Sequence, residues 1–101
     1  MTDAEKRRKK IDALRPEVKK MLGKTYPNDN GDNYPRGMND PDYISKQDIS
    51  EVTYAIASFL VDFDIEFTQT NVKIIEKEIH EQYGKAIRAD IKKCVKILFG
   101  K

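Results

Sequence analysis

Cysteine, histidine and tryptophan are almost missing from this chain of 101 residues, which has one Cys, one His and no Trp. The lone Cys94 excludes an intramolecular disulfide, and Cys94 with His80 cannot supply the ligands of a structural zinc site. No apolar run approaches the roughly 18 residues of a membrane span. We therefore expect a soluble intracellular protein, in the cytoplasm, nucleus or nucleoid, with no cofactor and no membrane partner.

The usual constellations of catalytic residues are also missing. There is no glycine-rich phosphate loop and no nucleophile with a matching base, and we expect His80 to be an ordinary surface residue. Asn28, Asn30 and Asp32 alternate as in a calcium loop. However, Asn33 stands where that loop requires its turn glycine, so the pattern fails. The sequence predicts neither an enzyme nor a metal site.

Charge is plentiful but unevenly distributed. Charged residues make up 36% of the chain and apolar residues 39%. Residues 1–24 hold nine Lys or Arg against four Asp or Glu, and residues 85–101 hold six against one, so each end carries +5. Residues 25–84 hold four against twelve, or −8. The sequence thus has two basic ends and an acidic middle.

The clearest helical pattern lies between Ile44 and Phe63. Ser45 is a favoured N-cap and Asp48 completes an acidic capping box, so we expect the helix to begin at Lys46. Apolar residues then recur at steps of three and four, as on one face of a helix: Ile49, Val52, Ile56, Phe59, Leu60 and Phe63. A second apolar stripe contains Tyr54 and Val61. This helix should therefore be covered on two sides.

The N-terminal residues 1–23 form a second amphipathic pattern. Thr2 and Glu5 make a capping box, and Gly23 is expected to stop the helix. Pro16 lacks the N–H that a helix needs, so it predicts a kink or a break with a short second segment after it. We expect this element to cover the second stripe of the central helix through Leu14, Val18 and Met21.

A long connection and two more helices complete the pattern. Residues 24–44 are rich in Pro, Gly, Asn and Asp and have no period, which indicates a loop. Thr68 is the expected N-cap of a helix that ends at Gly84 and buries Val72, Ile75, Ile79 and Tyr83. The last helix is expected to bury Ile87, Ile91, Cys94, Val95 and Leu98, with Cys94 as a small apolar residue. The predicted central cluster is Ile56, Phe59, Ile75, Ile79, Ile91 and Leu98.

Together these patterns predict an all-α fold, a small helical bundle in a single domain over residues 1–101. It has a three-helix core over 45–101, a kinked N-terminal helix over 1–23 and a long loop over 24–44. The segment AIASFLVDFDIEFTQTNVKIIEKEIHEQYGKAIRADIKKCVKIL resembles the C-terminal domain of the chromatin protein DEK. The resemblance rests on Thr68, the Ile75 and Ile79 pair, the Tyr83-Gly84 stop and the following isoleucines. It implies a winged-helix-like three-helix domain over 49–99 that binds DNA or chromatin.

Two hypotheses for function follow from these observations. The first is a nucleic-acid-binding module that contacts phosphates through its basic ends, if the fold brings them to one side. The expected contact residues are Arg7, Arg8, Lys9, Lys10, Lys85, Arg88, Lys92 and Lys96. The second is an adaptor or inhibitor that binds a partner protein through the loop and exposed apolar residues. Its expected residues are Tyr26, Tyr34, Tyr43, Ile74 and Ile97. A homodimer through the same apolar residues is a third alternative.

Overall fold

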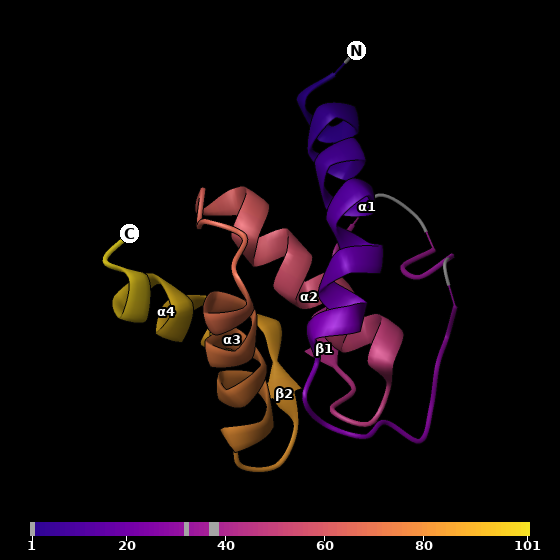
Figure 1. Cartoon of the computed structure of the whole chain (residues 1–101), viewed down its shortest axis with the longest axis vertical. Coiled ribbons are helices and arrows are strands. Elements are labelled where there is room, and N and C mark those ends of the chain that lie inside the picture. The colour runs from indigo at the N-terminus through magenta and orange to yellow at the C-terminus, as the bar shows by residue number, and fades with distance from the viewer. Residues whose placement is uncertain (1, 32, 37–38) are drawn as a thin grey trace.

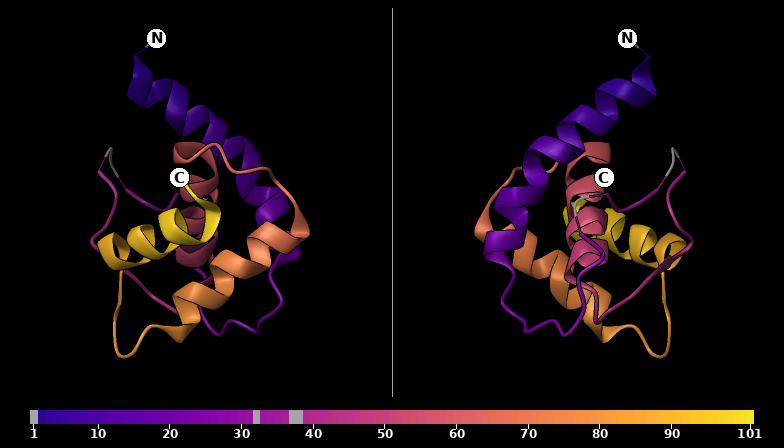
Figure 2. Two further views of the ribbon diagram at one scale, coloured as in Figure 1. Left: turned by 90° about the vertical axis from the view of Figure 1, so that its left-hand side faces the viewer. Right: turned by 90° about the vertical axis from the view of Figure 1, so that its right-hand side faces the viewer.

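The computed structural model of the chain describes residues 2–31, 33–36 and 39–101. The described residues form four helices and two short strands: α1 (Asp3–Met21), β1 (Tyr43–Ile44), α2 (Ile49–Asp62), α3 (Gln69–Glu81), β2 (Ala86–Ile87) and α4 (Arg88–Phe99). In Figure 1, α1 and α4 lie on opposite sides of α2 and α3. The two turned views agree with this placement (Figure 2). The predicted helical fold is confirmed, with the small strand pair as an addition.

Helix α2 is the centre of the hydrophobic core. Every residue from 52 to 60 is buried, although an isolated surface helix would bury only one stripe. Helix α1 packs along one side of α2, and α3 and α4 contact it as well. The predicted burial of α2 on two sides is therefore confirmed, and Val18 of α1 is fully buried as expected.

The start of α2 differs from the prediction. The N-cap is Asp48 rather than Ser45, and its carboxylate accepts hydrogen bonds from the backbone N–H groups of Ser50 at 3.0 Å and Glu51 at 3.3 Å. Ser45 instead lies in a turn, where its carbonyl accepts from the Asp48 N–H at 3.2 Å. Asp48 is the better N-cap than Ser45 because its carboxylate also accepts a hydrogen bond from the Asn30 N–H in the loop. A charged acceptor with a tertiary partner is a stronger cap than an isolated hydroxyl.

Helix α1 runs without interruption through Pro16, so the predicted second segment does not exist. Its capping box of Thr2 and Glu5 is present as expected. Ile11 and Val18 are fully buried before and after the proline, and their packing holds both halves in one helix. The helix ends at Met21, two residues before the expected glycine stop.

Helix α3 begins where expected, because the Thr68 side chain accepts from the Asn71 N–H at 3.1 Å. Val72, Ile75 and Ile79 are buried as predicted. The prediction for Tyr83 is wrong, since its exposed fraction is 104%. The helix already ends at Glu81, so Tyr83 no longer follows the helical period and lies on the turn towards β2.

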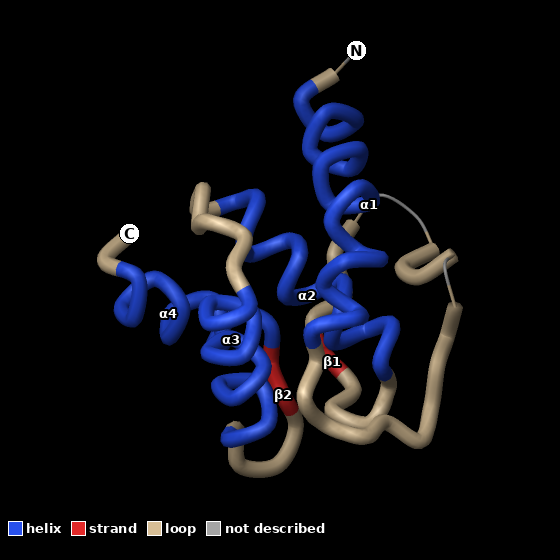
Figure 3. Tube along the Cα trace, in the orientation of Figure 1, coloured by secondary structure: helices blue, strands red, loops and turns tan. Residues whose placement is uncertain are grey.

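A two-stranded antiparallel ribbon joins the loop to the last helix (Figure 3). Tyr43 pairs with Ile87, and Ile44 pairs with Ala86. Opposed residues share a face of such a ribbon, and here Ile44 and Ala86 are buried while Tyr43 and Ile87 are exposed. The sequence analysis missed this ribbon because each strand has only two residues.

Helix α4 begins at Arg88 and buries Ile91 and Val95. The predictions that Ile87 and Leu98 belong to the core are wrong, because their exposed fractions are 38% and 51%. Ile87 is in the ribbon rather than the helix, and α4 projects away from the other helices towards its C-terminal end (Figure 1). Within the described part of the chain, no helix has both the length and the apolar character that crossing a membrane requires.

Candidate functional surface

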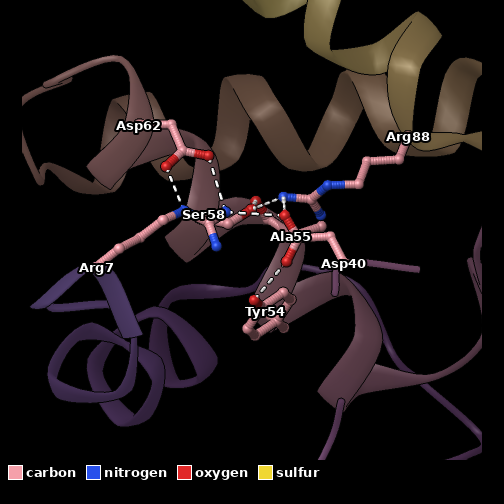
Figure 4. Close-up of polar contacts among 7 residues, drawn as sticks. All are labelled: Arg7, Asp40, Tyr54, Ala55, Ser58, Asp62 and Arg88. Atoms are coloured by element: carbon pink, nitrogen blue, oxygen red, sulfur yellow. Dashed lines mark hydrogen bonds and ion pairs between the residues drawn. The ribbon is translucent and has the colours of Figure 1, made fainter. Parts of the chain in front are cut away.

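Two of the arginines predicted to contact phosphates are engaged inside the protein (Figure 4). Arg7 binds Asp62 through two nitrogens at 2.6 and 2.9 Å, and it reaches Asp40 at 2.9 Å. Arg88 lies 3.2 Å from Asp40 and donates to the Ser58 hydroxyl, and only 12% of its side chain is exposed. These contacts compete directly with phosphate binding by both arginines.

We call these residues the Asp40 cluster, because Asp40 contacts Arg7, Arg88 and Tyr54. The Tyr54 hydroxyl donates to Asp40 at 2.6 Å. Burial acts to raise the pKa of Asp40, but this hydrogen bond and the two guanidinium groups outweigh it and hold the pKa below its ordinary value. The guanidinium carbons of Arg8, Arg15 and Arg88 lie 5.4, 5.5 and 5.8 Å from the centre of the Tyr54 ring. The cluster joins the loop, α1, α2 and α4.

Arginines of the two basic ends meet at the Asp40 cluster, but the exposed lysines of the two ends lie on different helices. Arg8 donates to the carbonyl of Pro35 in the loop at 3.1 Å, while Lys9 and Lys10 are exposed on α1. The remaining candidates Lys85, Lys92 and Lys96 are exposed on or next to α4, and the amine of Lys92 lies 5.9 Å from the centre of the Phe63 ring at the end of α2. The N-terminal segment is thus a helix of the fold rather than a projecting arm.

Two of the three loop tyrosines fix the loop to the helices. The Tyr26 hydroxyl donates to Glu76 at 2.6 Å, and the Tyr34 hydroxyl donates to Glu51 at 3.3 Å. Burial and the neighbouring carboxylate raise the pKa of each tyrosine, so both phenols stay protonated as donors. Both side chains are half-buried. Only Tyr43 of the three remains exposed for a partner.

The expectation of an ordinary surface position for His80 is wrong. Its ring is half-buried, and Nε2 lies 2.8 Å from the Tyr26 hydroxyl. Because the single phenolic proton goes to Glu76, His80 Nε2 carries a proton and donates to the Tyr26 oxygen. Burial and the nearby positive charge of Lys24 lower the pKa of His80. This chain of contacts holds the start of the loop against α3.

An apolar surface is left uncovered on α4 and the adjoining ribbon. We call it the α4 surface, and it consists of Tyr43, Ile87, Cys94, Ile97 and Leu98. Ile97 is 81% exposed and Leu98 51%. Cys94 is half-buried, one turn before both, and Ile87, the N-cap residue of α4, lies two turns before Cys94. Tyr43 lies beside Ile87 across the ribbon.

Basic side chains border the α4 surface. Lys93 is exposed one turn before Ile97, while Lys92 and Lys96 are exposed on the opposite flank of α4, with the Lys92 amine 5.9 Å from the centre of the Phe63 ring. The amine of Lys85 lies 5.1 Å from the centre of the Tyr43 ring. Next to this pair the surface is hollowed by about 410 Å³ between the ribbon and the turn that precedes α2. The outer side of α4 is therefore partly apolar and partly cationic.

The helical periodicity of the sequence does not distinguish this exposed surface from the core. Cys94 and Leu98 continue the stripe of Ile91 at helical spacing, so they look like core residues. The signal that could have revealed it is the width of the stripe, because adding Ile97 makes it broader than one packed neighbour can cover. No protein-family model matches the chain, and comparison with curated proteins and with solved structures finds no match either.

Proposed function

We propose that this chain is a non-enzymatic protein-interaction module whose α4 surface binds an acidic amphipathic helix of a partner protein. The observation that carries the proposal is the exposure of Ile97 and Leu98 on a helix whose other exposed residues are mainly lysines. Exposed apolar residues bordered by polar ones are typical of protein interaction sites. Phosphate backbones offer no apolar surface that would match them.

The positive charge beside the α4 surface favours an acidic partner. Lys93 is exposed one turn before Ile97 on α4, so it would lie beside a helix that covers Ile97 and Leu98. A second copy of α4 carries four basic residues against the single acidic Asp90, so two copies would repel each other through their net positive charge. A helix with glutamate or aspartate on either side of an apolar stripe places opposite charges there instead. We therefore favour an acidic partner helix over a homodimer.

The test uses a labelled synthetic helix with leucines at steps of three and four and glutamates at most other positions. Fluorescence anisotropy should show binding by the intact protein and none to a scrambled peptide of the same composition. Burying Ile97 is worth about 1.5–3 kcal/mol, so Ile97→Ser should weaken binding by about tenfold or more. The matched control is Ile74→Ser, because Ile74 is 37% exposed on α3, outside the α4 surface.

Three outcomes would reject the proposal. The first is equal binding of the scrambled and ordered peptides, because charge alone would then explain the signal. The second is equal loss of affinity in the Ile97 and Ile74 variants. The third is a concentration-dependent dimer that Ile97→Ser dissociates, since the α4 surface would then belong to a second copy.

Nucleic-acid binding is the second candidate, and one observation favours it. Lys92, Lys93 and Lys96 present three exposed amines from one helix. If they contact duplex DNA, each phosphate they neutralise adds about −0.9 to the slope of log affinity against log salt. Lys92→Ala should then reduce that slope by about one unit in gel shifts. Ile97→Ser should leave DNA affinity unchanged, and this difference separates the two candidates.

A further inference from the structure

We propose that a cleft between α1 and α2 is a binding site for a small organic anion that has an apolar body and a hydrogen-bond donor. The cleft has a volume of about 520 Å³, within the range typical of small-molecule sites. It is formed by the middle of α1, the first turns of α2 and the loop at Gly31. In Figure 1, α1 and α4 lie on opposite sides of the molecule, so this site is separate from the α4 surface.

A buried hydroxyl without a partner marks the inner wall of the cleft. Thr53 is 3% exposed, and its Oγ1 has no hydrogen-bond partner among the residues that the structure describes. Buried polar groups are nearly always hydrogen-bonded, because an unpaired one loses its water without compensation. Thr53 lines the cleft, so a ligand there can supply the missing hydrogen bond.

A second hydrogen-bond acceptor of the cleft lies on α1. Pro16 has no N–H, so the carbonyl of Asp12, four residues earlier, lacks its helical donor. Both residues line the cleft. The ring of Pro16 and the methyl group of Thr53 add apolar groups to the residues that line the cleft. The interior thus favours an apolar body with an O–H or N–H donor.

The basic residues of the cleft are arranged by depth. The exposed fraction of the side chain rises from 12% at Arg15 to 39% at Lys19 and 72% at Lys20. Each has one carboxylate partner on the protein, at 3.2, 2.9 and 3.5 Å respectively. The pairs of Lys19 and Lys20 are the more exposed ones, and exposed ion pairs are weak and exchange readily. A carboxylate or phosphate on the ligand would therefore find its counter-charges at the opening, while its body lies inside.

The probes for the test share one body and differ in charge: para-hydroxyphenylacetate, its neutral amide and tyramine. Each has a phenolic donor, and only the first is an anion. Amide chemical shifts of the isotope-labelled full chain are followed by NMR at millimolar probe concentrations. We expect shifts at Arg15, Lys19 and Thr53, with affinity falling from the acid to the amide to the amine. Inorganic phosphate, which has no apolar part, should not reproduce the chemical-shift change of the Thr53 amide.

Two variants with matched controls locate the contacts. Thr53→Val keeps the shape of the side chain and removes the hydroxyl, so it should weaken binding of the acid by about tenfold. Thr70→Val makes the same change at an exposed position of α3 and should have no effect. Lys20→Gln should weaken the acid but not the amide. Lys77→Gln is its control, because Lys77 is also 72% exposed and also paired with a glutamate.

The proposal is overturned if the acid leaves the amides of the cleft unshifted at millimolar concentration. It is also overturned if Thr53→Val binds the acid as tightly as the unchanged protein, because the hydroxyl would then be satisfied by water alone. Tyramine binding as tightly as the acid would exclude an anion site. As a control, each variant should keep a cooperative melting transition, because a loss of binding can then not be due to unfolding.

Discussion

At the scale of single residues, buried and half-buried polar side chains connect segments that are far apart in the sequence. Asp40, in the loop, accepts from Tyr54 of α2 and pairs with Arg7 of α1 and Arg88 of α4. Glu76 is 3% exposed and accepts from the Gly23 N–H at 3.0 Å as well as from the Tyr26 hydroxyl. A buried carboxylate is stable only when it is paired or hydrogen-bonded. These two acids therefore fix where the loop lies.

His80 gives the first prediction, because its pKa is lowered in the folded protein by burial and by Lys24. The unfolded chain, with its ordinary pKa of about 6.5, binds the proton first as the pH falls. The contribution of His80 to the free energy of unfolding is complete above about pH 7 and decreases below that, towards the folded pKa. Urea melts at about pH 7.5 and about pH 5.5 should show lower stability at the acidic value.

The control for this prediction is His80→Gln, which cannot titrate and should show a much smaller difference between the two pH values. His80 is the only histidine of the chain, and aspartate and glutamate titrate mainly below this window. Higher stability of the unchanged protein at the acidic value would contradict the prediction. It would mean that Glu76 stabilises the protonated imidazole more than burial disfavours it.

At the scale of elements, the caps of the helices decide where the long loop ends. The Asp48 carboxylate is 4% exposed and accepts from two N–H groups of α2 and from the Asn30 N–H at 3.2 Å. The Asn28 N–H also donates to the carbonyl of Gln47 at 3.1 Å. The start of α2 is thus tied to the loop. A cap chosen by such tertiary contacts can override the local sequence signal.

Substitution of the two candidate caps gives the second prediction. Asp48→Ala should lower the free energy of unfolding by about 1–2 kcal/mol, because it leaves buried N–H groups of α2 without an acceptor. Ser45→Ala should change it by less than about 0.5 kcal/mol, since only the backbone of Ser45 takes part in the turn. Denaturant melts of both variants provide the comparison. A larger loss from Ser45→Ala would place the start of α2 at the position that the sequence suggested.

The fold was largely predictable where local signals agree with packing. Thr2 and Thr68 cap their helices as expected. The predicted core positions Val52, Ile56, Phe59 and Leu60 of α2 and Val72, Ile75 and Ile79 of α3 are buried, while Ile49 and Phe63 at the ends of α2 are half-buried. The predictions failed at Tyr83 and Leu98, near the ends of α3 and α4. Periodicity gives the phase of a helix, but it does not say how far the neighbouring elements extend to cover it.

The candidate sites were harder to predict than the fold. Arg7 and Arg88 look like free positive charges in the sequence, since their partner Asp40 is far away in the chain. Thr53 is one of several polar residues in a largely apolar helix, and nothing local indicates that its hydroxyl lacks a partner. In each case the property depends on which distant residues meet it. That information comes from the tertiary structure and not from the local pattern.

At the scale of the whole molecule, α1 completes the core rather than extending from it. Ile11 and Val18 are fully buried, and Leu14 and Met21 pack against the same cluster. Helix α1 also forms one wall of the proposed anion cleft and supplies Arg7 to the Asp40 cluster. The α4 surface, on the other side of α2, does not involve α1. The two proposed sites therefore depend on α1 to different degrees.

Removal of residues 1–23 gives the last prediction. Each buried apolar side chain of α1 contributes about 1.5–3 kcal/mol, so losing Ile11 and Val18 together with their half-buried neighbours removes much of a typical stability of about 5–15 kcal/mol. The lost packing also uncovers Tyr54 and other residues of α2 that are buried on the α1 side. A chain that starts at Lys24 should therefore show no cooperative thermal transition by circular dichroism, and a peptide of residues 1–23 added in trans should restore helical signal. A shortened chain that melts cooperatively at the temperature of the full chain would mean that α2, α3 and α4 form a stable core without α1.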